Sequence, residues 1–294
     1  MKKSVFIFSL LISVTAMSAT WKKTTVTPPA ISTGTAGTAL TSAQCPTNYI
    51  FIPKSSPYTF SDFCVSKYEM KDDGYGSPTA KATGTPWTTI NRITSRIKCQ
   101  SLGAGYDLIS NDQWQTIARN ITGVAANWST ALYSGALNQG HSDGNPNNPL
   151  AAVTDDNDPC NGTGQTCSSS VWSSQRRTHV LSNGNVIWDF AANVYEWVTN
   201  DSNVAYSGDA YVATLSAGDI RQSRYGSAAG TFCAAPGGSP FCGMGAARVG
   251  YTGGAVARGG TWSMGDQSGI FTVSLEADPT FGDVIAGFRC IFTH

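Results

Sequence analysis

Eight cysteines set the strongest constraint on what this 294-residue chain can fold into. An even set of cysteines in an exported protein indicates a framework of disulfide bonds, although the count alone does not give the pairing. The two-residue cysteine spacings typical of zinc sites are absent from the sequence. We therefore interpret the cysteines as disulfide-forming, with metal ligation as the alternative.

Spacing narrows the pairing of these cysteines. Two pairs bracket short loops that can close without help from the rest of the fold: Cys160 with Cys167, and Cys233 with Cys242. Of the remaining four, Cys45 and Cys64 flank a predicted hairpin. A bond between Cys99 and Cys290 would tie a helix to the last strand.

The first 19 residues have the form of a cleavable signal peptide. Lys2 and Lys3 precede an apolar run over residues 5–14, and small residues follow up to Ala19. This run is shorter than the roughly 20 apolar residues of a membrane-spanning helix, and no later stretch approaches that length. We therefore expect an exported protein, secreted, periplasmic or on the cell surface, with no membrane span after cleavage.

Composition predicts one loop-rich domain behind a flexible segment. Residues 20–44 are rich in Thr, Ser, Pro and Gly, as in a tether, and residues 45–294 suffice for one domain. Charged residues make up only 13% of the chain while glycine occurs 31 times, which is typical of many loops on a compact core. Lys plus Arg equals Asp plus Glu at 19 each, without a basic cluster, so we do not expect a nucleic-acid partner.

Strands are predicted at both ends of the domain. The β-branched and aromatic runs at 49–52 and 63–70 are separated by Pro and Ser residues and predict a strand pair. The last third returns to short strands at 185–189, 195–198, 256–262 and 287–292.

Two helices are predicted between these strands. The first follows Asn91 and ends at Gly103, and it carries three apolar residues on one face: Ile93, Ile97 and Leu102. Ser110 and Gln113 form a capping box at the start of the second helix. Its apolar residues recur at helical spacing: Trp114, Ile117, Ala118 and Ile121.

Residues 125–177 form an unusually long segment without periodicity, and a compact domain must organise it. The local disulfide and a bound cation are the two candidates. Four aspartates near turns supply hard oxygen ligands for a cation: Asp143, Asp155, Asp156 and Asp158. The alternative is an acidic, solvated loop, because their spacing does not match an EF-hand.

Four segments in fixed order resemble the formylglycine-generating, sulfatase-modifying-factor family. They are 65–70, 108–119, 188–197, and 258–262 together with 287–290. The resemblance implies an α+β, C-type-lectin-like fold with two helices on small antiparallel sheets, long loops and disulfide bonds. It also supports the Cys99 to Cys290 pairing, because such domains commonly tie their first helix to their last strand.

The family's catalytic cysteines have no counterpart here. Members that make formylglycine bind copper through two cysteines shortly after a Gly-Gly-Ser, which matches Gly259, Gly260 and Thr261. The cysteine positions read Met264 and Gly269. A thioether cannot form the substrate disulfide and glycine has no side chain, so the resemblance implies a member without this activity and without copper.

The resemblance further implies bound calcium. The family's calcium loop maps onto two side chains and two carbonyls: Asp189, Ala192, Val194 and Glu196. The alternative is that Glu196 pairs with an arginine such as Arg289 and that Asp189 caps a turn. A second, loosely aligned calcium site would draw on Asn138 and the 155–158 loop, including Asp156.

The segment after the Gly-Gly corner has the composition of a binding surface. Residues 263–283 mix small, polar and aromatic types without periodicity, and the expected ligand contacts are Ser263, Met264, Asp266, Gln267, Phe271 and Phe281. In this fold, variable receptor-binding proteins of phage and bacteria carry their changing residues in the same region. The alternative is an ordinary surface loop.

These observations predict an exported, non-catalytic binding module, similar to an adhesin or receptor-binding protein, that recognises an extracytoplasmic protein or glycan. Two alternatives stay open. One is an oxidoreductase of the formylglycine-generating type that acts on a peptide, and the other is a structural subunit of a surface fibre or envelope assembly.

Overall fold

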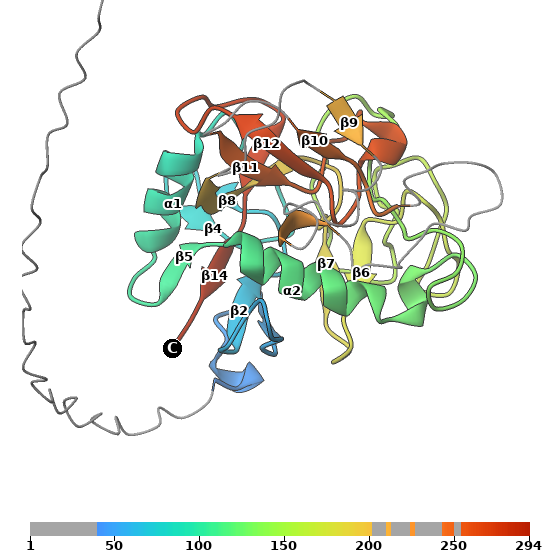
Figure 1. Cartoon of the computed structure of the whole chain (residues 1–294), viewed down its shortest axis with the longest axis horizontal. Coiled ribbons are helices and arrows are strands. Elements are labelled where there is room, and N and C mark those ends of the chain that lie inside the picture. The colour runs from blue at the N-terminus through green and yellow to red at the C-terminus, as the bar shows by residue number, and fades with distance from the viewer. Residues whose placement is uncertain (1–39, 202–209, 213–223, 227–242, 250–253) are drawn as a thin grey trace, which may run out of the picture. The chain divides into compact units, whose positions relative to one another are not determined.

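The computed structural model describes residues 40–201, 210–212, 224–226, 243–249 and 254–294. Within these residues the fold is mixed α+β, with two α-helices, short 3-10 helices and small sheets (Figure 1). The predicted signal peptide, most of the predicted tether, and the Cys233 to Cys242 pairing lie outside the described residues. The domain boundaries therefore stay predictions.

A four-stranded antiparallel sheet joins the two ends of the domain in the order β1-β2-β14-β5. Its strands are β1 (Tyr49–Ile52), β2 (Phe63–Ser66), β14 (Cys290–Phe292) and β5 (Tyr106–Leu108). The predicted strand pair is confirmed as the β1–β2 pair, in which Tyr49 lies opposite Ser66.

A six-stranded sheet has the order β13-β8-β11-β12-β10-β9. Its strands are β13 (Ala286–Phe288), β8 (Tyr195–Asp201), β11 (Ala255–Arg258), β12 (Val273–Ala277), β10 (Ala247–Val249) and β9 (Ala210–Val212). The expectation of antiparallel sheets is wrong for this one, because β13 runs parallel to β8 and β10 runs parallel to β12. After β12 the chain passes β11 and β8 before it forms β13, and a crossover of this kind allows a parallel pair where a hairpin does not.

The last predicted strand is divided at Arg289. Residues 286–288 belong to the six-stranded sheet and residues 290–292 to the four-stranded sheet. Arg289 itself is fully buried. The C-terminal segment therefore joins the two sheets, with a buried arginine at the junction.

The remaining elements are short. Two further pairs are β3 (Lys71–Asp72) with β4 (Pro78–Thr79), and β6 (Thr178–Val180) with β7 (Val186–Trp188). The 3-10 helices are η1 (Ser42–Gln44), η2 (Ala125–Asn127) and η3 (Gly265–Gln267). None of the helices in the described part of the chain is long and apolar enough to cross a membrane.

Helix α1 (Arg92–Gln100) begins as predicted, since the Asn91 side chain accepts a hydrogen bond from Thr94 N (2.8 Å). Its predicted core face is wrong, because Ile93 and Ile97 are 48% and 58% exposed. The buried face carries Ser95 and Cys99 instead. The bond from Cys99 to Cys290 turns that face toward the sheets, and the two isoleucines are left in solvent.

Helix α2 (Asn111–Thr122) confirms both its predicted start and its predicted face. Ser110 Oγ accepts from Gln113 N (3.2 Å) and Gln113 Oε1 accepts from Ser110 N (2.8 Å). Its apolar residues are fully buried in one core with residues of both sheets: Trp114, Ile117, Ala118 and Ile121. Burying this face stabilises the fold by about 1.5–3 kcal/mol for each large apolar side chain.

Three disulfide bonds form as expected in the described part of the chain. They are Cys45–Cys64, Cys99–Cys290 and Cys160–Cys167.

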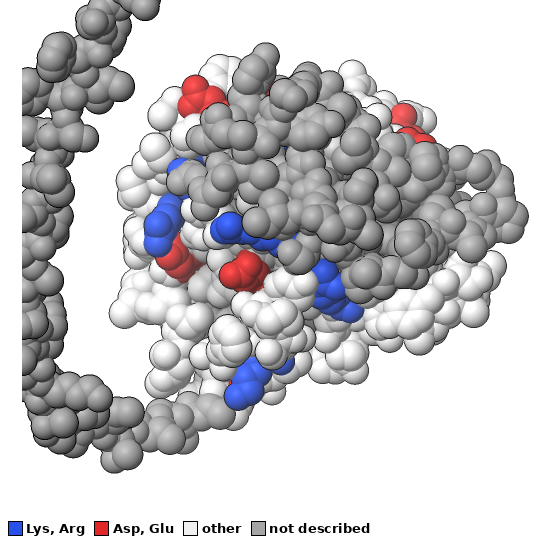
Figure 2. All heavy atoms as spheres, in the orientation of Figure 1, with Lys and Arg blue, Asp and Glu red and all other residues white. Residues whose placement is uncertain are grey.

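Figure 2 shows one face of the molecule, on which the described Lys, Arg, Asp and Glu side chains lie in small separate groups among uncharged residues.

Candidate functional site

The first candidate site is a pair of loops, residues 142–148 and 261–268, which we call the paired-loop face. Three hydrogen bonds join the loops: Gly144 N to the Trp262 carbonyl (2.7 Å), Gly265 N to the Ser142 carbonyl (2.8 Å), and Trp262 Nε1 to Asn147 Oδ1 (3.0 Å). Backbone and side chain together therefore hold the two loops at a fixed distance.

The first loop is also anchored to Gln175, and the second loop is closed on itself. Gln175 Oε1 accepts from Ser142 N (3.0 Å), and Gln175 Nε2 donates to Ser142 Oγ (3.2 Å). Ser268 Oγ donates to the Thr261 carbonyl (2.9 Å), which closes the second loop on itself. Such a surface is preorganised before a ligand binds, which lowers the entropy cost of binding.

The exposed side chains of the paired-loop face are polar and short. In the second loop Ser263 and Asp266 are exposed, whereas Met264 and Gln267 are half-buried. In the first loop the exposed residues are Asp143, Asn145, Asn147 and Asn148. Carboxylates, amides and hydroxyls of this kind are hydrogen-bonding groups that suit a polar ligand.

The residues of the predicted binding region do not form one surface in the structure. Phe281 is 62% exposed, but its loop rests on the start of α1, where Thr89 N donates to the Asp283 carbonyl (2.9 Å) and Asn91 Nδ2 to the Thr280 carbonyl (3.1 Å). The second loop of the paired-loop face instead contacts residues 142–147. The two parts of the 263–283 segment therefore rest on different parts of the domain.

Phe271, which was predicted as a ligand contact, lies in the interior. It is 5% exposed and belongs to the main core, with the Arg119 guanidinium 5.9 Å from its ring centroid. Phe271 N donates to the Met244 carbonyl (2.8 Å), and this bond fixes the backbone just before β12. The aromatic ring fills the interior, so the expectation from composition that Phe271 lies at the surface does not hold.

A second polar cluster lies in the interior and contains the carboxylates predicted to bind calcium. Both oxygens of Asp189 are held by Arg177, from Nε and from Nη2 at 2.7 Å each. Glu196 accepts from Arg289 Nη2 at 2.7 Å. All four side chains are buried. The pairing of Glu196 with Arg289, which the sequence left open as an alternative, is therefore present.

These carboxylates do not fit calcium as its ligands in this arrangement. Asp189 and Glu196 are each already neutralised by a guanidinium, so an added divalent cation would bring two uncompensated charges into a buried region. Ala192 and Val194 are buried beside them. Calcium binding itself stays a prediction.

The residues of the predicted second calcium site have other partners. Asn138 Nδ2 donates to the carbonyls of Arg176 and Thr178, at 2.8 and 2.9 Å. Asp156 pairs with Lys67 (2.7 Å) and accepts from Trp188 Nε1 (2.8 Å). No group of three or more His, Cys, Asp or Glu side chains suited to a metal occurs within the described ranges.

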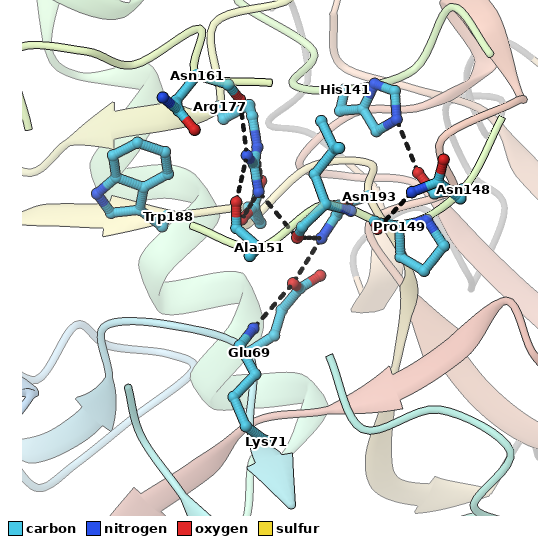
Figure 3. A network of polar contacts seen from close by, with 12 residues as sticks. Glu69, Lys71, His141, Asn148, Pro149, Ala151, Asn161, Arg177, Trp188 and Asn193 are labelled. Atoms are coloured by element: carbon cyan, nitrogen blue, oxygen red, sulfur yellow. Dashed lines mark hydrogen bonds and ion pairs between the residues drawn. The ribbon is translucent and has the colours of Figure 1, made fainter. Parts of the chain in front are cut away.

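Glu69 is a third buried carboxylate in the interior cluster, and no pattern of residues indicates its burial. It accepts from Asn193 Nδ2 (2.7 Å) and lies 3.8 Å from Lys71 Nζ (Figure 3). Burial, together with the nearby Asp189 carboxylate, raises the pKa of Glu69 well above its ordinary value. Burial lowers the pKa of Lys71 to about 8. Lys71 therefore stays mostly protonated at neutral pH, whereas burial disfavours the charged form of Glu69.

The buried side chain of His179 should make the free energy of unfolding depend on pH. It is fully buried on β6, with Nε2 3.0 Å from the Asn138 carbonyl, and burial lowers its pKa to about 3. Between pH 6.5 and that value the unfolded chain takes up a proton that the folded chain does not. As pH falls through this window, His179 should lower the free energy of unfolding by about 1.4 kcal/mol per pH unit.

The measurement compares urea unfolding of the wild type and His179→Gln between pH 7 and pH 4. Glutamine can donate to the Asn138 carbonyl but does not titrate. The difference between the two proteins isolates His179, because Glu69 and His141 titrate in both. Parallel pH profiles would show that His179 does not govern the acid sensitivity.

No family model and no curated protein matches the sequence, so membership of the formylglycine-generating family stays a prediction.

Similar solved structures include Treponema denticola variable protein 1, with a TM-score of 0.42 and 14% identity, covering 80% of this chain and 85% of that chain. The Major Tropism Determinant P3c and I1 variants have TM-scores of 0.40 and 0.41 and 14% identity, covering 85% of this chain. They are matched over 53% and 54% of their own length, so this chain spans about half of them. Likeness at this level is too remote to assign a function.

Proposed function

We propose that this protein is an exported, non-catalytic binding module that recognises an extracellular protein or glycan through the paired-loop face. The observation that supports this most is the combination of exposed polar side chains with a fixed backbone beneath them. Ser263 and Asp266 are exposed on a loop that hydrogen bonds lock to Ser142 and Gly144. Functional surfaces commonly combine variable loops with a rigid scaffold in this way.

The packing around Gly269 supports a non-catalytic role. A Cβ atom at this position would collide with the Gly243 carbonyl oxygen and the Met244 carbonyl carbon. A cysteine therefore does not fit at the second of the two family catalytic positions without a shift of the backbone. Met264, at the first position, is half-buried and packs against the core.

The fold type and the location belong to the same proposal. A C-type-lectin-like domain accounts for two helices, small sheets, long loops and the Cys99–Cys290 bond between α1 and the last strand. Three disulfide bonds within the described residues favour an oxidising compartment outside the cytoplasm.

The proposal predicts that Ser263→Arg with Asp266→Arg abolishes binding and leaves folding intact. Both side chains are exposed, so two added arginines should block a ligand sterically and by charge. The mature protein is tested against an array of purified glycans and extracellular-matrix proteins, and any binder is titrated. We expect at least about a tenfold loss of affinity, or about 1.4 kcal/mol.

The matched control is Phe281→Ser with Tyr75→Ser, which changes two exposed aromatic residues outside the paired-loop face. This variant should bind like the wild type and melt at the same temperature. Loss of binding in the control but not in the Ser263 and Asp266 variant would assign recognition to another surface.

A further inference from the structure

Arg177 is surrounded by oxygen atoms in the interior of the domain. Its guanidinium donates to both oxygens of Asp189 at 2.7 Å and to three carbonyls of the long loop: Ala151 (2.8 Å), Asn161 (2.9 Å) and Leu150 (3.1 Å). Figure 3 shows the side chain reaching the loop backbone at Ala151 and Asn161. Arg177 is fully buried.

This environment satisfies the guanidinium completely. An arginine side chain has five N–H donors, and here five hydrogen bonds use them. One carboxylate and several backbone carbonyls are also the kind of oxygen set that calcium takes in proteins. A positive charge at the centre of such a set neutralises the carboxylate and orients the carbonyl dipoles, whether a metal or a guanidinium supplies it.

The bonds of Arg177 organise the segment that has no periodic structure. Leu150 and Ala151 are neighbours at one point of the 125–177 loop, and Asn161 lies at a second point. Arg177 N donates to the Pro159 carbonyl (2.8 Å) beside the Cys160–Cys167 bond. Asp189 N donates back to the Arg177 carbonyl (2.7 Å). The loop is thus tied at several points to one side chain and its main chain.

The same interior cluster links this loop to the paired-loop face. Asn193 Oδ1 accepts from Leu150 N (2.8 Å), and Asn193 Nδ2 donates to the Leu150 carbonyl (3.1 Å). His141 Nε2 lies 3.1 Å from the Asn148 carbonyl. Residues 142–148 are therefore held at both ends by buried groups of the network that Arg177 completes.

We propose that Arg177 is a built-in cation that organises the 125–177 loop in place of a calcium ion, so that the folded domain does not depend on metal. Arg177 acts as a positioning residue for the first loop of the paired-loop face. The stability part of this proposal holds whether or not that face binds a ligand, and its test uses stability alone.

The first test is thermal melting of the wild-type mature protein in excess calcium and in excess chelator, together with elemental analysis. We expect the same melting temperature in both conditions and no stoichiometric calcium. A melting temperature that falls on chelation, or one bound calcium per chain, would overturn the proposal.

The second test replaces the charge itself. Arg177→Met should lower the melting temperature by about 10 °C, because it leaves Asp189 buried without a partner. Arg177→Lys should melt between this variant and the wild type, since lysine keeps the charge but has only three donors. Calcium should change neither value.

The control is Arg96→Met, because Arg96 makes the same two-pronged contact with Asp107 at the surface, at 2.9 Å for both bonds. An exposed pair contributes little, so this variant should melt within about 2 °C of the wild type. If Arg177→Met melts like Arg96→Met, the guanidinium does not organise the loop. If Arg177→Met fails to fold, the proposal is tested by whether Arg177→Lys melts below the wild type and by the chelation result.

Discussion

Replacing Arg289 with methionine should lower the free energy of unfolding by about 3–5 kcal/mol, because it leaves the buried Glu196 carboxylate without its partner. Arg289 donates to Glu196 at 2.7 Å and to the carbonyls of Ser66 and Trp188 at 2.8 and 2.9 Å. It thus connects β2, β7 and β8 where the chain passes from one sheet to the other. Urea unfolding followed by tryptophan fluorescence measures the loss.

Two further variants separate the charge from the packing. Lys67→Met removes the partner of Asp156, whose carboxylate is partly exposed, and should cost less than about 1 kcal/mol. Arg289→Met combined with Glu196→Met removes both charges and should recover part of the stability lost in the single variant. An Arg289→Met loss no larger than the Lys67→Met loss would contradict the role of this pair.

Removing the Cys99–Cys290 bond should have an effect of similar size. The bond joins residues 191 apart in sequence, and loop-closure entropy assigns about 5 kcal/mol to a cross-link of that span. It also determines which face of α1 is buried. Cys99→Ala with Cys290→Ala should therefore unfold at much lower urea concentration than the wild type.

The matched control is the short bond between Cys160 and Cys167, which are 7 residues apart. The same relation assigns it about 2 kcal/mol, so the double alanine variant at these positions should lose less than half as much. Equal losses for the two bonds, or a larger loss for the short one, would contradict the entropic account.

The parts of the fold that local sequence determines could be predicted. Helix α2 was predicted together with its cap and its core face, because Ser110, Gln113 and the apolar residues act within a few turns of one another. Helix α1 was predicted with the wrong face, because Ile93 and Ile97 have helical spacing but Cys99 has a distant covalent partner. A long-range bond overrode the local pattern.

The candidate site could be predicted only in part, for the same reason. Ser263 and Asp266 were identified from composition and are exposed, but their partner loop at 142–148 was missed. The two loops are joined mainly through backbone groups, which every residue carries, so no residue pattern marks the pairing. Phe271 was expected at the surface but is buried, because an aromatic residue beside polar ones suits a core as well as a surface.

The role of Arg177 also could not be predicted from the sequence. Arginine is rarely buried without a partner, and its acceptors here include three backbone carbonyls that leave no trace in the residue types. Among these acceptors only Asp189 contributes a side chain, and its carboxylate was predicted to bind calcium. The long loop was expected to need a disulfide or a cation, and the cation in the structure is a side chain.

The most direct test of the binding role is hydrogen–deuterium exchange of the mature protein, alone and with any purified glycan or extracellular-matrix protein that binds it on the array. We expect new amide protection in residues 142–148 and 261–268 and little change elsewhere. Protection confined to another surface, or no binder among the probes, would contradict the assignment of the paired-loop face.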